Sequence, residues 1–174
     1  MLETSRLVLR SFSKEDKSDF YEIFKKQEVV QYLPLQPLTL NEAANKLDNI
    51  ISNLSNFKAV KPKFILAINL KEKDRVIGWV GSGPIPFDQK KTELFYALDS
   101  NYWHNGYAIE AARRVLKFLL ENKNLKEVFA LVDADNQGSV KLLNKLNFSF
   151  DQKVNLTEKK FDFFNGLNLY RYSD

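Results

Sequence analysis

The chain has 174 residues, which fits one domain of ordinary size, and 44% of them are hydrophobic, enough to form a core. Its 26 Lys and Arg against 22 Asp and Glu give a net charge of +4, which helps an anionic ligand approach but is far from the clustered basic surface of a nucleic-acid-binding protein. The absence of Cys excludes disulfides and thiolate nucleophiles, and the single His, His104, cannot form a multi-histidine metal site. No run approaches the about 20 apolar residues of a membrane span, and the N-terminal sequence lacks the features of a signal peptide. Composition therefore predicts a metal-independent, cytoplasmic protein with one domain over residues 1–174.

The first third of the chain predicts a strand followed by two helices. Residues 6–12 alternate apolar and polar side chains, as a strand with one buried face does. Ser13 and Asp16 have the spacing of a capping box at a helix N-terminus, and Thr39 and Glu42 repeat that spacing. The second helix is expected to bury one face, whose apolar positions are Ala43, Leu47, Ile50, Ile51 and Leu54.

The rest of the chain predicts strands interrupted by two helices. Residues 64–70 and 75–81 flank a polar turn and are typical of a hairpin, after which Gly83-Pro84 is expected to start a loop. Further strands are predicted at 93–98, 126–132, 148–154 and 161–172, and helices at 106–122 and 136–146. This order predicts an α+β fold with a largely antiparallel sheet and one strand–helix–strand crossover from 93 to 132.

The turn before the helix at 106–122 has the features of an anion site. A helix start leaves backbone N–H groups unpaired, and its dipole favours negative charge there. Gly106 and Ala108 are small, so a diphosphate can approach the backbone closely. The same residues also fit a tight turn without a ligand, and spacing alone does not separate these two interpretations.

The turn before the helix at 136–146 contains a second candidate pair. Asn136 is placed to cap that helix, with Ser139 three residues further on. The Asn136 side-chain amide both donates and accepts hydrogen bonds, so it can also hold an amide-rich ligand. Capping and ligand contact are compatible.

Four stretches of the chain, in order, resemble the GNAT N-acetyltransferase superfamily, and within it the RimJ/RimL type, the ribosomal-protein-alanine acetyltransferase-like branch. TSRLVLRSFSKEDKSDFYEIF is similar to that branch's first strand and helix, and ELFYALDSNYWHNGYAIEA to its fourth strand, pyrophosphate loop and helix start. VDADNQGSVKLLNKLNF resembles its Asn-x-x-Ser helix, and NGLNLYRYS its last strand. Trp103 takes the first position of the loop pattern Q/R-x-x-G-x-G/A, as is normal in this branch. Asn147 replaces a usual Gly, and Asn tolerates the left-handed conformation that Gly would supply.

The resemblance implies a three-layer α/β/α fold whose mixed, mostly antiparallel central sheet is splayed. Acetyl-CoA would be the acetyl donor, without a metal, and its pantetheine arm would enter between the strands at 93–98 and 126–132. A backbone amide near Leu98 would stabilise the oxyanion of the tetrahedral intermediate. The implied cofactor-binding residues are Tyr96, Ala97, Leu98, Trp103, His104, Asn105, Gly106, Tyr107, Ala108, Asn136 and Ser139.

The implied reaction is direct attack of a primary amine on the thioester, and the amine must be neutral to attack. Because an α-amine has a pKa of about 7.7–8.0 and Lys about 10.4, a general base helps but need not be strong. Glu93, at the start of its strand, and Glu158, which matches by position a carboxylate proposed as base in this branch, are the two candidates. Both also fit ordinary surface positions. Ser139 is the candidate to pass a proton to the leaving thiolate. His104 is not expected to be the general base, because it lies in the phosphate loop.

The acceptor is expected at the junction of the first two helices, where Tyr32, Leu33 and Pro34 lie, with Trp79 and Tyr96 as further walls. A protein N-terminal α-amine and a small-molecule amine (a polyamine, amino sugar or amino acid) are alternatives that share every cofactor residue. A non-catalytic acyl-CoA-binding module is a third, and the scattered Lys residues disfavour a nucleic-acid binder. Monomer and homodimer both stay open, and no membrane or nucleic-acid partner is expected.

Overall fold

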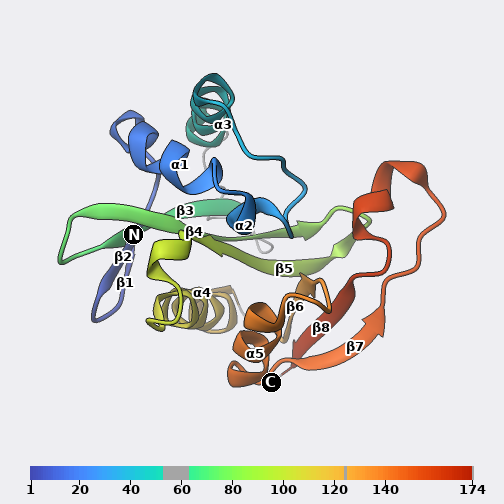
Figure 1. Ribbon diagram of the computed structural model, residues 1–174. Helices are drawn as coiled ribbons and strands as arrows, with labels where there is room; N and C mark the ends of the chain where they lie inside the picture. Colours follow the sequence, from blue (N-terminus) through green and yellow to red (C-terminus); the bar gives the residue numbers. More distant parts are fainter. Residues whose placement is uncertain (53–62, 124, 174) are drawn as a thin grey trace.

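A computed structural model describes residues 1–52, 63–123 and 125–173 as a central sheet with helices on both faces (Figure 1). The strands are β1 (Leu2–Glu3), β2 (Leu7–Arg10), β3 (Phe64–Leu70), β4 (Arg75–Ile85), β5 (Asp88–Leu98), β6 (Glu127–Val132), β7 (Ser149–Lys153) and β8 (Asn168–Ser173). The helices are α1 (Lys17–Phe24), α2 (Gln27–Val30), α3 (Leu40–Ser52), α4 (Tyr107–Lys123) and α5 (Gln137–Lys145), and the 3-10 turns are η1 (Lys14–Asp16), η2 (Ser100–Tyr102) and η3 (Lys159–Phe164).

The layers and the strand order are those of the predicted fold. Helices α1, α2 and α3 cover one face of the sheet, and α4 and α5 cover the other (Figure 1). Within the described residues the sheet has eight strands in the order β1-β2-β3-β4-β5-β6-β8-β7. Every neighbouring pair in that order is antiparallel except β5 and β6, which are parallel and are joined by α4. The predicted three-layer α+β fold with a mixed, mostly antiparallel sheet is confirmed.

Both predicted capping boxes form. The Ser13 backbone N–H donates to Asp16 Oδ2 at 2.8 Å, although the first turn that follows is the 3-10 turn η1 rather than α-helix. The Thr39 N–H donates to Glu42 Oε2 at 2.8 Å, and α3 begins directly after Thr39. Of the stripe predicted for α3, Leu54 lies outside the described residues. The short elements β1 and α2 were not predicted, because elements of two and four residues are too short to show a period.

Three predicted boundaries after residue 80 are wrong. The strand predicted at 93–98 begins at Asp88, because the β4–β5 hairpin continues the ladder to Ile85 and Asp88, so Glu93 lies within β5 rather than at its start. The chain does not leave the sheet at Gly83-Pro84, since β4 continues to Ile85 and Pro84 pairs with Thr92 of β5. A register shift follows directly at Pro84/Ile85, where the ladder can accommodate a residue without an N–H. The last strand does not begin near residue 161 but at Asn168, because residues 159–164 form η3.

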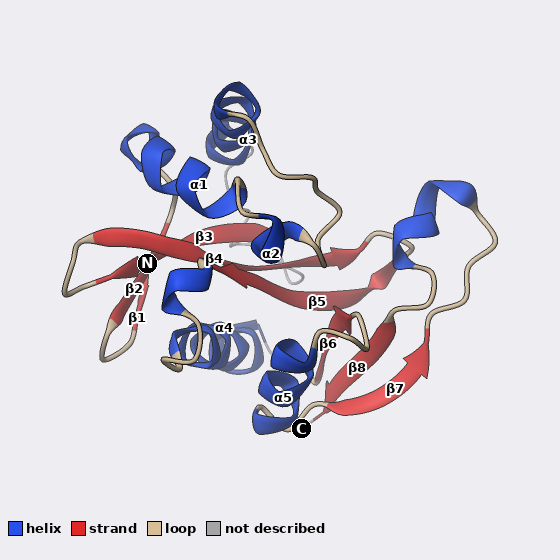
Figure 2. Cartoon of the chain, in the orientation of Figure 1, coloured by secondary structure: helices blue, strands red, loops and turns tan. Residues whose placement is uncertain are grey.

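The turn η3 lies on an arm formed by two long loops (Figure 2). Rings of Phe161 and Phe164, three residues apart, both pack on Phe87 in the β4–β5 turn, with centroid distances of 6.1 and 5.6 Å. A spacing of three puts both rings on one side of a 3-10 turn, whereas an extended strand would send them to opposite faces. This packing explains why an aromatic-rich run that resembles a strand is not one.

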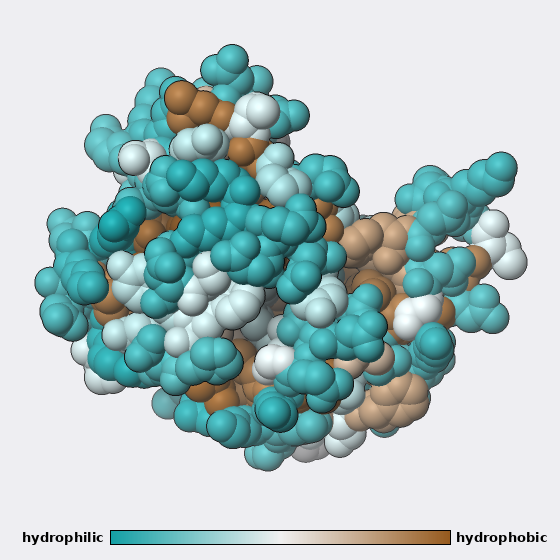
Figure 3. All heavy atoms as spheres, in the orientation of Figure 1, coloured by the Kyte–Doolittle hydropathy of each residue, from teal (hydrophilic) through white to brown (hydrophobic). Residues whose placement is uncertain are grey.

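Apolar side chains fill the space on both faces of the sheet. Beneath α1 and α3, the rings of Phe20, Phe24 and Trp79 form one cluster, with 4.3 Å between the centroids of Phe24 and Trp79. A larger cluster joins the opposite face to α4 and α5, and a smaller one lies between β6, β8 and η3. On the surface, hydrophobic residues gather where the α1–α3 layer faces the η3 arm (Figure 3). No helix in the described ranges is long and apolar enough to cross a membrane.

Candidate active site

Strands β5 and β6 separate shortly after they meet. The two parallel strands pair at one register position, Glu93 opposite Phe129, and β5 then runs on to Leu98 without a further partner in β6. Parallel strands normally share an evenly spaced ladder of hydrogen bonds. Its interruption leaves an open edge of β5 over residues 94–98, which confirms the predicted splay.

The open edge offers backbone groups of alternate residues. Asp99 donates its N–H to the Ile77 carbonyl at 2.8 Å, so residue 99 faces β4. Because successive strand residues direct their backbone groups to opposite edges, Leu98 and Tyr96 face the opening, whereas Ala97 faces β4. The Leu98 carbonyl there accepts a hydrogen bond from Trp103 Nε1 at 2.8 Å. Of the three predicted strand residues, Tyr96 and the N–H of Leu98 therefore remain available at this edge.

The loop from Trp103 to Gly106 is exposed and leads into α4. His104 has φ of 63° and Gly106 of 80°, so the backbone turns sharply through left-handed conformations. At Gly106 this conformation strongly favours glycine. The unpaired N–H groups of the first turn of α4 follow directly on this turn, and an anion at that helix start is stabilised by them and by the helix dipole.

On the α5 side of the opening, the structure brings Tyr96 and Ser139 together. Asn136 Oδ1 accepts the Ser139 N–H at 3.1 Å, which confirms the predicted N-cap of α5. The Tyr96 hydroxyl is buried and faces the Ser139 side chain, but no hydrogen bond of normal length satisfies it among the described residues. Burial raises the pKa of Tyr96 to about 12, and the nearby Ser139 lowers it again only in part. The phenol therefore stays protonated and is a potential donor.

Glu93 lies at the fork of the opening, on the other face of the sheet. It shares a face with Ala97, which packs under α1 and α3, and with Phe129, which packs toward η3. Burial between these two clusters raises the pKa of Glu93 to about 7, and the backbone of Leu131 opposes that rise. A carboxyl group with this pKa exchanges its proton near neutral pH, as a general base must.

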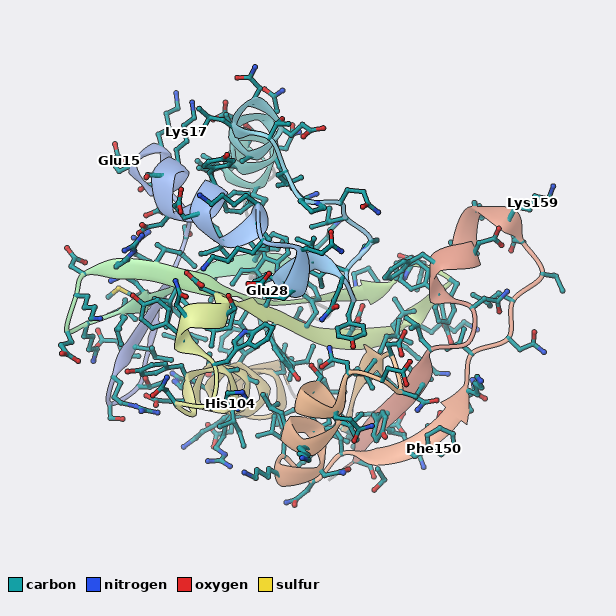
Figure 4. All side chains as sticks on the ribbon, viewed as in Figure 1. Glu15, Lys17, Glu28, His104, Phe150 and Lys159 are labelled. Atoms are coloured by element: carbon teal, nitrogen blue, oxygen red, sulfur yellow. The ribbon has the colours of Figure 1, made fainter. Side chains whose placement is uncertain are left out.

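Glu158, the other candidate base, has a different environment. It lies at the start of η3, where its carboxylate pairs with Lys160 at 2.8 Å and its side chain is 61% exposed. Figure 4 labels the next residue, Lys159, at the outer tip of the arm, far from His104 of the loop. The structure thus places Glu158 in solvent rather than beside Glu93.

The residues expected to line the acceptor pocket lie partly in the core and partly on the surface. Trp79 is 7% exposed and stacks on Phe24, so it belongs to the core beneath α1. Tyr32 and Leu33 are partly buried and Pro34 is exposed in the segment after α2, as a binding surface requires. In the described ranges no group of three or more His, Asp or Glu side chains could hold a metal ion.

Several contacts with the loop escape a reading of the sequence, because they join residues far apart in the chain. Lys26, before α2, forms an ion pair with Asp99, and Ser100 Oγ donates to Glu28 Oε1 at 2.9 Å. These contacts tie the α1–α2 junction to the start of the loop. Arg6 reaches the far end of the loop from the β1–β2 turn, about a hundred positions earlier in the chain. For the Arg6 contact, the local signal in the sequence was the acidic residue Glu110 in the first turn of α4, a favoured position for a carboxylate.

Comparison with known proteins identifies the class of this protein. A family model described as an acetyltransferase (GNAT) domain matches residues 6–149. The uncharacterized N-acetyltransferase p20 of Bacillus licheniformis is 33% identical over 147 residues, which are 84% of this chain and 81% of that protein. The fold and the matches together define an N-acetyltransferase. The chain belongs to the GNAT acetyltransferase family, as the four matched stretches of sequence indicated.

Solved structures share the architecture along almost the whole chain. The microcin C7 self-immunity acetyltransferase MccE, in complex with acetyl-CoA and AMP, superposes with a TM-score of 0.74 at 15% identity, covering 98% of this chain and 94% of that one. The ribosomal-protein-S5-alanine acetyltransferase from Vibrio fischeri superposes with a TM-score of 0.70 at 20% identity, with the same coverage. At these identities the likeness establishes the fold.

Proposed function

We propose that this chain transfers the acetyl group of acetyl-CoA to a protein N-terminal α-amine by direct attack on the thioester. The observation that carries the proposal is the position of Glu93, a carboxyl group whose pKa is raised to about 7 by burial, at the fork where β5 and β6 separate. Beside it, β5 has no partner in β6 over residues 94–98, and an extended pantetheine arm would pair with that edge as a strand does.

The donor would bind along the opening from the α4 side. The diphosphate would lie against the backbone amides of residues 104–108, and the pantetheine amides would pair with the free edge of β5 at Tyr96 and Leu98. The Asn136 amide group, whose oxygen caps α5, would still have its two N–H donors for the ligand. In this arrangement the pantetheine would lie between Leu98 and the fork, because the two are five strand residues, or about 16 Å, apart. The thioester carbonyl would then lie toward the fork and accept a hydrogen bond from a free N–H of the β5 edge nearer to Glu93 than Leu98 is.

Acid–base matching favours an α-amine as acceptor. A base of pKa about 7 removes a proton from an α-ammonium of pKa about 7.7–8.0 at little cost, whereas a Lys ammonium of about 10.4 is more than three units away. The name of the Vibrio fischeri structural neighbour, an alanine acetyltransferase of a ribosomal protein, agrees with such an acceptor. The acceptor would approach over the α1–α2 junction, past Tyr32 and Leu33.

The steps balance without a covalent enzyme intermediate. The ammonium proton passes to Glu93 and the neutral nitrogen attacks the carbonyl carbon. The tetrahedral intermediate then loses a second N–H proton as the C–S bond breaks and the amide forms. The CoA thiolate, of ordinary thiol pKa about 8.5, leaves on the Tyr96 and Ser139 side and takes up that second proton, relayed by the Ser139 hydroxyl or by solvent, while Glu93 returns its own proton to solvent. The Tyr96 hydroxyl, which has no partner of its own among the described contacts, can donate a hydrogen bond to the developing thiolate.

Release of CoA thiol from acetyl-CoA, measured with a panel of amines at pH 7, tests the function. A peptide with a free N-terminus and no Lys should be acetylated about a hundredfold faster than an N-terminally blocked peptide with one Lys, because far more of the α-amine is neutral. Equal rates for the two peptides would contradict the α-amine acceptor. Turnover of a polyamine, an amino sugar or a free amino acid without turnover of any peptide would assign a small-molecule acceptor instead, and binding of acetyl-CoA without any turnover would leave a non-catalytic module.

A further inference from the structure

Arg6 makes four separate contacts at the start of α4. Its Nε donates to Glu110 Oε2 at 2.7 Å, and Nη2 lies 2.6 Å from the same carboxylate oxygen. Its Nη1 donates to the Asn105 carbonyl at 3.0 Å, and the guanidinium lies 4.4 Å from the centre of the Tyr107 ring. A Cβ added at Gly106 would meet Nη2 at 3.4 Å, so the guanidinium packs directly against the loop. One side chain therefore supports three consecutive residues of the proposed diphosphate loop.

Glu110 is a carboxylate in an unusual place for an anion-binding helix. It lies in the first turn of α4, and its side chain is 16% exposed. Burial alone would raise the pKa of Glu110, but hydrogen bonds from Thr4 and from Arg6 and the charge of Arg6 lower it overall. The carboxylate is thus ionised at neutral pH. Without a ligand that charge stabilises the helix dipole, but it repels a diphosphate at the same helix end.

The Glu110 carboxylate has a structural role as well, because it holds the turn between β1 and β2 in place. Glu110 Oε1 accepts hydrogen bonds from the Ser5 hydroxyl at 3.2 Å and the Arg6 backbone N–H at 3.0 Å, in addition to Thr4 Oγ1. The turn between the edge strand β1 and its neighbour β2 is thereby fixed to α4. A compensating cation is then needed if the helix start is to receive an anion.

We propose that Arg6 is a positioning residue of the acetyl-CoA site: it neutralises Glu110 and holds residues 105–107 in the conformation that binds the diphosphate. The proposal rests on the proposed function, which supplies the diphosphate. It predicts that the effect of Arg6 on binding depends on Glu110, whereas a cation that contacts the phosphates itself would act independently of that carboxylate. The Arg6 side chain is 44% exposed, so it can neutralise Glu110 without itself being a buried charge.

The experiment is a set of calorimetric titrations with acetyl-CoA and with acetyl-dephospho-CoA, which lacks the 3′-phosphate. Arg6→Met should weaken binding of both ligands by about tenfold, because it leaves an uncompensated carboxylate beside the diphosphate. Glu110→Gln should bind within about threefold of the native protein, and Arg6→Met/Glu110→Gln should recover most of the loss of the single Arg6→Met variant. Arg171→Met is the matched control, since Arg171 is similarly exposed and pairs with Glu127 at 3.3 Å on the far side of β6. It should bind both ligands as the native protein does.

Three results would overturn the proposal. Native affinity in Arg6→Met would show that the loop does not need the cation, and a double variant as weak as Arg6→Met would show that Glu110 is not the reason for it. A loss seen with acetyl-CoA but not with acetyl-dephospho-CoA would instead make Arg6 a 3′-phosphate ligand. If Arg6→Met does not fold, as judged by its thermal melting, Arg6→Lys with and without Glu110→Gln tests the same dependence. Failure of the native protein to bind acetyl-CoA would contradict the proposed function itself and is read from a separate titration.

Discussion

Replacing Glu93 with Gln is expected to lower kcat by about 10²- to 10⁴-fold while leaving acetyl-CoA affinity near its native value. The size is that of a lost general base, and Gln keeps the volume of the side chain at the fork. The reason lies in the position and pKa of Glu93, the one of the two predicted carboxylates that the sheet brings to the opening. Steady-state kinetics with an α-amine peptide measure the effect. Glu158→Gln is the matched control, because Glu158 is exposed beside Lys160, and its kcat should stay within a few-fold of native.

The pH dependence gives Glu93 a second signature. The carboxylate form is the active one, so kcat of the native enzyme should fall as pH drops through about 7, where Glu93 becomes protonated. That limb should be absent from the residual activity of Glu93→Gln. If the limb persists in Glu93→Gln and disappears in Glu158→Gln, the base is Glu158 and the assignment made here is wrong.

Stability should change in the opposite direction to activity. The folded-state pKa of Glu93 is raised above its unfolded value, so its contribution to stability is present below pH 4 and is lost as pH rises through about 7. Gln does not carry this penalty. At pH 8, Glu93→Gln should therefore raise the free energy of unfolding by about 1–3 kcal/mol, and at pH 4 the gain should vanish. Urea denaturation at the two pH values measures the difference.

The second large effect is expected at Gly106, where Gly106→Glu should weaken acetyl-CoA binding at least about a hundredfold. The new carboxylate would face the diphosphate across the start of α4 and would compete for Arg6, which lies against this residue. Calorimetry with acetyl-CoA measures the loss.

The backbone strain of this substitution needs its own control, because Gly106 has φ of 80°. Gly166 has φ of 85° and lies in the turn between η3 and β8, where its N–H donates to the Val154 carbonyl at 2.9 Å. Gly166→Glu makes the same chemical change with similar strain, so both variants should lose about 1–2 kcal/mol of stability. Only Gly106→Glu should lose binding. Equal loss of affinity in both would mean that strain, rather than charge at the diphosphate, is responsible.

Features of the fold that depend on local chemistry were predictable from the sequence. The hairpin strand β3 has the predicted bounds, and both capping boxes form between residues three positions apart. Asn147 adopts φ of 64°, the left-handed conformation expected at a position where the resemblance implied Gly. Features that depend on distant contacts were not predictable. Residues 159–164 form a 3-10 turn because Phe161 and Phe164 pack on Phe87, and the sequence of the segment itself does not indicate that contact.

The same division holds for the candidate site. The loop and the N-cap at Asn136 were visible because a helix start has a local signature. The raised pKa of Glu93 could not be predicted from the sequence, since its burial is produced by clusters on both sides of the fork. The spacing of residues also could not show that Trp103 donates a hydrogen bond to the Leu98 carbonyl, or that the Tyr96 and Ser139 side chains lie together. Such side-chain contacts depend on the folded sheet.

Amide hydrogen exchange with and without saturating acetyl-CoA is the measurement that tests most directly whether the opening between β5 and β6 receives the donor. If it does, exchange should slow at Tyr96 and Leu98 and across residues 104–108, while β1 and β7, at the two edges of the sheet, stay unchanged. Unaltered exchange at the open edge of β5, or protection confined to another part of the molecule, would contradict the site described here.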